Sequence, residues 1–544
     1  MGNTHGGPPD AKRSMMSRPA RLRLQAIAAA SAIAVALLPG VVSAGRGEPD
    51  VSVATILAAY THATHSDDVT TYAAQGTLVG EGLTGTFTVV RDGTNEREDD
   101  VMGPRHETTL RLGDRVFVRN ANGNVRELRG YLHRRELTED LLDSGAFAAH
   151  PELARFAGWG NAGGVRAWRL EVRAAGGEPE TLWIDAGSGL PLRLEFLDGD
   201  GPSFVEYGDW RDVAGRKIPF RAVLTDGDRR YDTVQQTTSV TIDRPVDAAA
   251  FAPLAPRLLA TDRVHTVPLV EREGHVGAMV QCAGRQWFFL LDTGAQSILV
   301  DTSVLKAAGI APQGALEVRG ATRSGGLGVA ILPSLAIDGA ALDNVVVSSL
   351  DLGRSVGGKL HFDGILGYPF FASALVEMDF SNHLLRFGPP GSFTPRGTAM
   401  ALDVDRELAE TSLRVNAVQA PFIIDTGNSS EMLLYRPFLD AHAGLVPFST
   451  AGSWNYGIGG ANATYRTTVD DLEIGGVTLY HRTVDVVLAR QGAFADQVDA
   501  GNIGLGVLRN FVATFDLGGS TMYLAPGAQF DDGRLRASLP ATSS

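Results

Sequence analysis

The tripeptide Asp-Thr-Gly occurs twice in the chain, at Asp292-Thr293-Gly294 and at Asp425-Thr426-Gly427. Each copy follows an apolar run, 287–291 or 421–424, with the composition of a buried strand. Two carboxyl groups that lie close together in a buried site cannot both ionise, so one stays protonated while the other remains charged. Such a pair can take a proton from water and give one to a leaving group, which is general acid and base catalysis.

Each residue type in the tripeptide suits this chemistry. The aspartates carry the reaction. Glycine lets the backbone turn sharply and bring its N–H beneath the carboxylate. Threonine, which is stiff at χ1, can hydrogen-bond across an interface and hold the two loops in register. A single Asp-Thr-Gly is also an ordinary turn sequence after a strand. The second copy, and the repetition of the segments that follow, favour the hypothesis that the two aspartates form a catalytic pair.

The segments after the two copies repeat as well. Asp363-Gly364-Ile365-Leu366-Gly367 follows the first copy, and Ile503-Gly504-Leu505-Gly506-Val507 follows the second. Each is succeeded by a strand-like run that contains an aspartate, at 376–380 and at 513–517. Because a repeat of this length is too long for a solenoid, the pattern indicates two duplicate lobes that face one another.

These motifs make residues 262–528 resemble the aspartic-protease superfamily, with both lobes in one chain as in the pepsins. In that family an apolar-apolar-Gly strand threads a psi-shaped loop beneath the catalytic aspartate. The resemblance implies that Ile365, Leu366 and Gly367 form this strand in lobe one, and that Leu505 and Gly506 form it in lobe two. The second copy departs from the pattern because a glycine replaces its first apolar residue.

Ala295 and Asn428 stand where the pepsins carry Ser or Thr, whose hydroxyl bonds the catalytic carboxylate. Alanine at this place is typical of the retroviral-type proteases, so each lobe resembles a retropepsin. Loss of that hydroxyl removes a bond that favours the charged carboxylate. We therefore expect the pair to titrate at higher pH than in pepsins, with activity from mildly acidic toward neutral pH.

Two Gly-rich segments stand where a flap over the site is expected. The segment in lobe one, 319–326, includes Gly320 and Gly325 and lacks an aromatic residue. The segment in lobe two, 454–460, offers a better candidate, and its flap residues are Tyr456, Gly457 and Gly459. Such hairpins suit mobile lids that close over an extended peptide, although plain β-hairpins have the same composition.

The region before the lobes, residues 48–255, has the sequence pattern of a separate β domain. A short helical pattern at 53–60 precedes alternating strands such as 85–90 and 115–118. The order resembles the periplasmic lipoprotein-carrier family, a half-open antiparallel barrel around an apolar cavity. The resemblance carries no catalytic residues, and a spacer or folding domain is an equally good reading.

The N-terminus reads as an export signal. Arginines at 18, 21 and 23 precede an apolar, Ala-rich run at 26–42, and Val-Ser-Ala comes directly before Gly45. These features predict a cleaved signal peptide and a periplasmic or secreted protein without stable membrane insertion; an uncleaved anchor is the alternative. Cys282 is the single cysteine, so neither a disulfide within the chain nor a lipid attachment site after the signal is expected.

Length and composition limit the number of domains and the classes of partner. A chain of 544 residues allows three or four domains. The net charge of −14 without a basic stripe argues against nucleic acid as a partner. No Cys or His motif suggests a metal, and no cofactor is expected. The segment 353–357 matches a nucleophile elbow, but it lies in a Gly-rich loop rather than between a strand and a helix.

The sequence therefore predicts a mainly β protein, with a bilobal aspartic-protease β-barrel fold preceded by an antiparallel half-barrel β domain that begins with a short helix. The favoured function is an exported aspartic endopeptidase acting on an extended polypeptide, and the alternative is a periplasmic binding protein for a peptide or acyl chain. We expect residues 258–530 to fold and cleave alone; the oligomeric state stays open. The expected segments are a signal peptide at 1–44, a β domain at 48–255, a linker at 256–263, lobe one at 264–393, lobe two at 396–528 and a flexible tail at 529–544.

Overall fold

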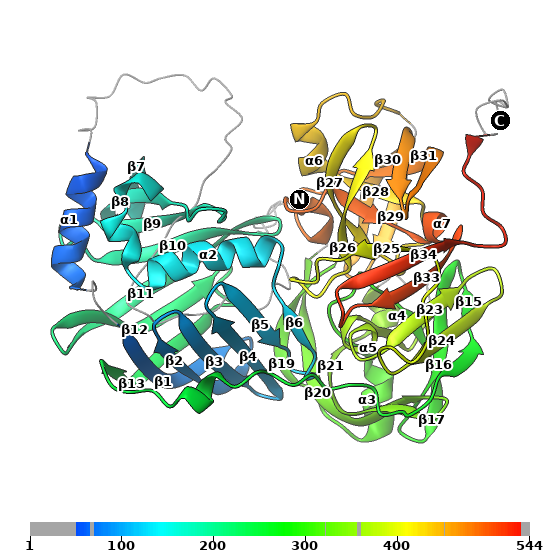
Figure 1. Cartoon of the computed structure of the whole chain (residues 1–544), viewed down its shortest axis with the longest axis horizontal. Coiled ribbons are helices and arrows are strands. Elements are labelled where there is room, and N and C mark those ends of the chain that lie inside the picture. The colour runs from blue at the N-terminus through cyan, green and yellow to red at the C-terminus, as the bar shows by residue number, and fades with distance from the viewer. Residues whose placement is uncertain (1–50, 66–69, 321–322, 356–360, 451, 535–544) are drawn as a thin grey trace, which may run out of the picture.

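The computed structural model describes residues 51–65, 70–320, 323–355, 361–450 and 452–534. The predicted signal peptide lies outside these residues, as does most of the predicted tail. Within the described part of the chain, no helix combines the length and the apolar character that a membrane span requires. Figure 1 shows two β-rich halves side by side, with the N-terminal domain on the left and the two lobes on the right.

The N-terminal domain is one antiparallel sheet that has thirteen strands among the described residues, in the order β6-β5-β4-β3-β2-β1-β13-β12-β11-β10-β9-β8-β7. Alternating burial along β2, where Leu83, Phe87 and Val89 are buried, is the mark of a strand with one covered face. The strands are β1 (Thr71–Gly80), β2 (Leu83–Asp92), β3 (Asn95–Met102), β4 (Arg105–Leu112), β5 (Arg115–Arg119), β6 (Val125–Glu127), β7 (Ala154–Ala162), β8 (Val165–Val172), β9 (Glu180–Asp185), β10 (Pro191–Asp198), β11 (Gly201–Val213), β12 (Arg216–Thr225) and β13 (Thr233–Ile242).

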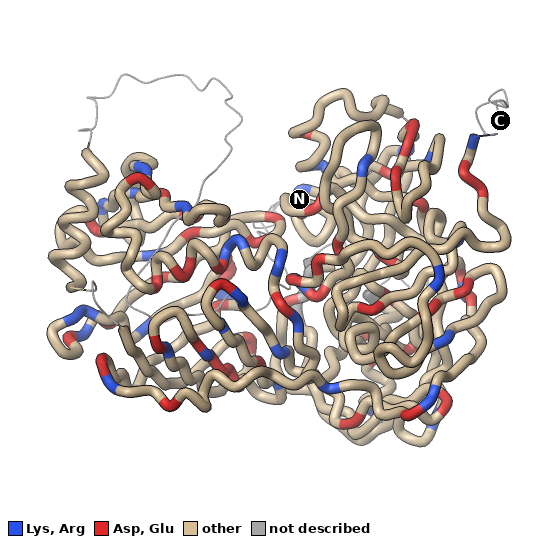
Figure 2. The backbone as a smooth tube through the Cα atoms, viewed as in Figure 1, with Lys and Arg blue, Asp and Glu red and all other residues tan. Residues whose placement is uncertain are grey.

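Two helices accompany this sheet. Helix α1 (Val53–Thr64) begins at Ser52, whose side chain accepts the backbone N–H of Thr55. Helix α2 (Tyr131–Asp143) lies across the sheet, because it reaches strands on both sides of it. Arg111 of β4 pairs with Glu136 at 2.7 Å, and the guanidinium of Arg135 stacks on Phe196 of β10. Figure 2 shows the resulting mixture of acidic and basic residues along α2 and the neighbouring strands. A helix that buries charged side chains therefore covers part of the sheet.

The two lobes repeat one strand order. Lobe one runs β16-β17-β22-β18-β21-β20-β19 with β15 at its edge, and lobe two runs β26-β27-β32-β28-β31-β30-β29. An extra pairing of β16 with β20 has its counterpart in β26 with β30, so both sheets curl in the same way. The strands are β15 (Val270–Arg272), β16 (His275–Cys282), β17 (Arg285–Leu291), β18 (Leu299–Asp301), β19 (Gln313–Arg319), β20 (Arg323–Ile337), β21 (Ala340–Leu350), β22 (Gly364–Leu366), β26 (Glu410–Val415), β27 (Val418–Ile424), β28 (Met432–Tyr435), β29 (Gly452–Gly457), β30 (Gly460–Ile474), β31 (Val477–Val487) and β32 (Gly501–Ile503).

A third sheet joins the lobes from below the site. Its order is β14-β24-β23-β33-β34-β25, and β23 of lobe one pairs antiparallel with β33 of lobe two. The bilobal fold and the β domain with its short N-terminal helix confirm the predicted fold class. The strands are β14 (His265–Pro268), β23 (Leu375–Asp379), β24 (Leu384–Gly388), β25 (Thr398–Ala401), β33 (Phe511–Asp516) and β34 (Thr521–Pro526). The helices of the lobes are α3 (Thr302–Ala308), α4 (Leu352–Ser355), α5 (Tyr368–Phe371), α6 (Arg436–Ala441) and α7 (Leu505–Leu508).

The N-terminal domain is anchored to the lobes by buried polar contacts. The Asp405 carboxylate accepts the backbone N–H groups of Arg129, Gly130 and His133, so a residue of lobe two caps the N-terminus of α2. Beside it, Arg126 pairs with Glu407 at 3.1 Å, and both side chains are buried. These contacts fix α2 against the lobes.

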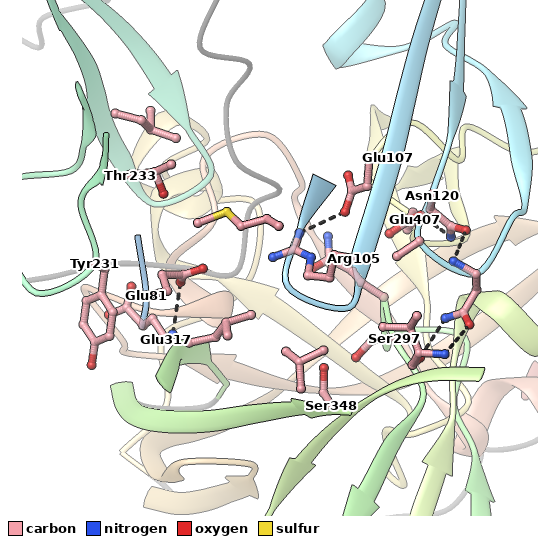
Figure 3. Close-up of a pocket in the computed structure, with 18 of the residues that line it drawn as sticks. Glu81, Arg105, Glu107, Asn120, Tyr231, Thr233, Ser297, Glu317, Ser348 and Glu407 are labelled. Carbon is pink, nitrogen blue, oxygen red and sulfur yellow. Dashed lines mark hydrogen bonds and ion pairs between the residues drawn. The ribbon is translucent and has the colours of Figure 1, made fainter. Parts of the chain in front are cut away.

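A small cavity of about 170 Å³ lies at the same interface. Figure 3 shows acidic side chains from both sides converging on it, together with Arg105. Glu81 of the N-terminal domain accepts the backbone N–H of Glu317 at 3.3 Å, and Arg105 pairs with Glu107 at 2.9 Å. Burial raises the pKa of Glu81. Charged side chains of the N-terminal domain and of the lobes therefore meet at this part of the interface.

Candidate active site

The two Asp-Thr-Gly segments follow β17 and β27 and meet between the lobes. The Asp292 N–H donates to the carbonyl of Leu366 at 3.1 Å, and the Asp425 N–H donates to the carbonyl of Ile503 at 2.9 Å. A Cβ at Gly427 would collide with the Asp292 carboxyl carbon, and one at Gly294 would lie 2.7 Å from that of Asp425. Each glycine therefore permits the opposite carboxyl group to approach, and the structure brings the two aspartates together.

Reciprocal threonine bonds hold the two loops. The Thr293 N–H donates to Thr426 Oγ1 at 3.0 Å, and the Thr426 N–H donates to Thr293 Oγ1 at 3.1 Å. Each hydroxyl then donates to a backbone carbonyl of the opposite lobe, that of Ile424 or of Leu291. Both threonines are buried, so these bonds replace water that the loops have lost.

The two carboxylates have different hydrogen-bond partners. Asp292 Oδ1 accepts the Gly294 N–H at 2.9 Å. Asp425 Oδ1 accepts the N–H groups of Gly427 at 2.9 Å and Asn428 at 3.1 Å, while its Oδ2 accepts the side-chain amide of Asn502 at 2.6 Å. Sequence reasoning did not identify Asn502. The dyad is therefore asymmetric in its surroundings although its lobes are duplicates.

Burial dominates the protonation of the pair. It raises the pKa of Asp292, against the opposing effect of the Gly294 N–H. Burial also raises the pKa of Asp425, and a charge on either carboxyl group opposes ionisation of the other. Two carboxyl groups in this relation titrate as a unit and share one proton over a range of pH. This is the protonation state that general acid and base chemistry requires.

The strand beneath the second aspartate differs from the predicted one. Leu505 and Gly506 belong to α7 rather than to a strand, so that assignment was wrong. In lobe two, β32 supplies Asn502 and Ile503, and Gly504 follows them. In lobe one, Ile365, Leu366 and Gly367 lie in the predicted place, in and just after β22. The apolar-apolar-Gly pattern failed in lobe two because a polar residue, Asn502, stands in its first position.

A cavity of about 770 Å³ contains both aspartates. Gly320, Tyr456 and Gly457 of the predicted flaps line it, whereas Gly459 is not among the lining residues; Gly325 belongs to β20 of the same hairpin as Gly320. The hairpins β19–β20 and β29–β30 meet above the site, because a Cβ at Gly320 would collide with the Ile458 carbonyl. Both hairpins thus form a roof over the dyad.

The N-terminal domain supplies a further wall of this cavity, which sequence reasoning missed. Residues in and just before α2, together with the end of β10 and the turn that follows it, line it along with the two aspartates. The turn is tied to lobe two, because Asp200 accepts the Gly492 N–H at 2.7 Å and the Gly199 carbonyl accepts that of Gln497 at 3.0 Å. The residues that form the wall are Leu128, Tyr131, Leu132, Arg135, Glu136, Glu139, Asp198 and Gly199.

No metal site accompanies the dyad in the described residues, where no three His, Cys, Asp or Glu side chains are grouped to hold an ion. Cys282 is buried in β16 behind the site. The groups that the site itself offers are the carboxyl pair and the main-chain groups of the roof.

The comparisons with known proteins agree with this geometry. A family model described as aspartyl protease matches residues 278–370, which include Asp292 and β22, so the predicted resemblance to the aspartic proteases is confirmed for lobe one. No curated protein matches the chain.

Several solved structures are similar to parts of the chain. An aspartic proteinase from Irpex lacteus shares 11% identity over 49% of this chain and 98% of its own, with a TM-score of 0.31. A retropepsin-like aspartic protease from Rickettsia conorii shares 19% identity over 23% of this chain and 91% of its own, with a TM-score of 0.18. A LolA superfamily protein from Nitrosomonas europaea shares 15% identity over 38% of this chain and 99% of its own, with a TM-score of 0.27.

Proposed function

We propose that the protein is an exported aspartic endopeptidase. The observation that carries this proposal is the pair of partly buried carboxyl groups, Asp292 and Asp425, brought together at the end of two equivalent strands. The apolar, Ala-rich segment before Gly45 supports export.

In the proposed reaction a water lies between the two carboxyl groups. The charged carboxylate takes its proton while the water oxygen attacks the scissile carbonyl, and the protonated carboxyl donates a hydrogen bond to the carbonyl oxygen. The tetrahedral intermediate collapses when the peptide nitrogen receives a proton from the pair. One new C–O bond replaces the C–N bond, and the products are an acid and an amine.

The substrate we propose is an extended polypeptide segment. Its main chain would bond the roof hairpins, and its side chains would occupy the pockets along the cavity. On one side these pockets include Leu433, Tyr435 and Phe494 of lobe two. On the other side they include Leu128 and Leu132 of the N-terminal domain. The substrate is therefore recognised by all three parts of the chain.

The test is cleavage of a peptide library by the purified full-length protein between about pH 4 and about pH 7. We expect Asp292→Asn and Asp425→Asn each to abolish cleavage while far-ultraviolet circular dichroism stays unchanged. The double variant should lose no more than either single one, because the two groups act as a unit.

A single variant that retains substantial activity would contradict the dyad. Peptides that bind the native protein without being cut would favour the binding-protein alternative. A statine-type peptide, which imitates the tetrahedral intermediate, separates the two readings: a catalytic site should bind it more tightly than the matching substrate peptide.

A further inference from the structure

Asn502 occupies a place in lobe two that Ile365 occupies in lobe one. In the parallel pairs beneath the aspartates, Asn502 pairs with Ile423 and Ile365 pairs with Leu290, each one residue before the end of its strand. Asn502 is 1% exposed. Burying an amide costs free energy unless the amide is hydrogen-bonded. The hydrogen-bond partners of Asn502 therefore indicate the role of its side chain.

The orientation of the Asn502 amide follows from a chain of hydrogen bonds. The Ser430 backbone N–H, which can only donate, lies 2.9 Å from the side chain of Asn428, so the atom facing it is Oδ1. The Ser430 hydroxyl donates to the same oxygen at 2.8 Å. Asn428 Nδ2 must then face Asn502, where it donates to Oδ1 at 2.8 Å. This leaves Asn502 Nδ2 to donate to Asp425 Oδ2 at 2.6 Å.

We propose that Asn502 is a positioning residue that, held by Asn428 and Ser430, keeps Asp425 as the charged member of the dyad and leaves the shared proton on Asp292. Asp425 accepts three N–H groups, each of which stabilises the carboxylate form. The matching side chains of lobe one, Ile365 and Ala295, cannot donate. The proposal deepens the proposed function and rests on it, because it assigns the base to Asp425 and the acid to Asp292.

Other charged groups near the pair are the same in the native protein and in a variant at position 502. Their effects on the ionisation of the two aspartates therefore cancel when the two proteins are compared. His275 of β16 acts on Asp292, and the phenol of Tyr435 on β28 feels the charge of Asp425. The remaining charged residues that line the cavity from the lobes are Glu273, Arg406, Arg466, Asp485 and Asp496, and those from the N-terminal domain are Arg135, Glu136, Glu139 and Asp198.

The first test is the pH dependence of kcat/KM for the native protein and for Asn502→Leu, which keeps the size and branching of the side chain without its donor. The acid limb reports the ionisation of the base. Because the charged form of Asp425 loses one donor, the acid limb should move upward by about one pH unit. The basic limb, where the pair loses its second proton, should move less. An acid limb that stays in place overturns the proposal.

The second test needs no activity and therefore separates this inference from the proposed function. Aspartate carboxyl carbons labelled with ¹³C are titrated by NMR, with Asp425→Asn used to assign the pair. In the native protein Asp425 should ionise at lower pH than Asp292, and Asn502→Leu should raise that lower midpoint. Ionisation of Asp292 first overturns the proposal, whether or not any peptide is cleaved.

Two further variants guard against a purely structural effect. Asn510→Leu removes a buried amide of the same lobe that donates to the Val507 carbonyl at 3.0 Å, away from the dyad. It should lower thermal stability and leave the NMR midpoints in place. Asn428→Ala keeps the backbone N–H on Asp425 but releases the Asn502 amide, so it should raise the lower midpoint by less than Asn502→Leu. Equal shifts from Asn510→Leu and Asn502→Leu would overturn the proposal.

Discussion

At the scale of single residues, the dyad combines the Asp-Thr-Gly segments, which both lobes carry, with the Asn502 amide, which only lobe two supplies. The repeated Asp-Thr-Gly, with its chemical requirement for glycine, placed Asp292 and Asp425 correctly between the lobes. Asn502 could not be predicted from the sequence, because its neighbours in the chain do not indicate that its side chain bonds a carboxyl group 77 positions away. The absence of a hydroxyl at Ala295 and Asn428 predicted that the carboxyl pair titrates at higher pH than in pepsins. This prediction now applies to Asp292, because the Asn502 amide donates to Asp425 where a hydroxyl would otherwise do so.

The threonine bonds yield a prediction about stability. Thr426→Val keeps the shape of the side chain but removes an acceptor from the Thr293 N–H and a donor from the Leu291 carbonyl. Leaving these buried groups without partners should lower the free energy of unfolding by about 2–4 kcal/mol. Denaturant unfolding of the full-length protein measures the change. Thr426→Ser, which retains the hydroxyl, should lose much less, and a valine variant as stable as the native protein would contradict the role of these bonds.

At the scale of elements, hydrophobic periodicity predicted the strands of the lobes but could not predict α2. The side of this helix that the fold buries includes Arg135, Glu136 and Glu139, so the apolar stripe on which periodicity depends is lacking. Its stability comes from ion pairs with neighbouring strands and from the cap by Asp405, all of them long-range contacts. Only the tertiary structure reveals such a helix, or its place beside the dyad.

The second roof hairpin carries a prediction about substrate binding. On β29, Trp454 is 61% exposed and Tyr456 is 45% exposed, and both line the cavity. Large exposed aromatic side chains beside a site are favoured contacts for a bound peptide. Trp454→Ala should raise KM several-fold with a smaller effect on kcat, as measured by steady-state kinetics.

A matched control for the hairpin is Phe448→Ala. Phe448 is 78% exposed in the same lobe but is not among the residues that line the cavity. Its replacement should leave KM unchanged. A similar rise in KM for both variants would indicate a general effect on lobe two rather than contact between Trp454 and substrate.

At the scale of the whole molecule, the structure changes the expectation for the two lobes without the N-terminal domain. Leu83 of the N-terminal domain and Leu316 of lobe one belong to one buried cluster, and α2 lines the cavity of the dyad. Removing the N-terminal domain would expose this apolar surface and open one wall of the site. We therefore predict that residues 258–530 alone unfold at lower temperature than the full chain and have a much higher KM. Full activity of this fragment would show that the wall makes no contribution.

The junction between the domains should also respond to pH. Burial and the nearby Asp405 raise the pKa of Asp403 to about 7, from an ordinary value of 3.8. Asp403 packs against the start of α2, because a Cβ at Gly130 would collide with its carboxyl group. The folded protein thus keeps a proton there that the unfolded chain has lost at intermediate pH.

The stabilisation from protonated Asp403 is complete below its unfolded pKa of 3.8 and is lost as pH rises through its folded pKa of about 7. Stability should therefore fall as pH rises across this interval. Asp403→Asn, which imitates the neutral acid, should make the unfolding temperature depend less on pH and make the protein more stable than the native one above about pH 7. Thermal unfolding of both proteins over a series of pH values tests this. Parallel curves for the two proteins would mean that Asp403 does not change its protonation at the junction.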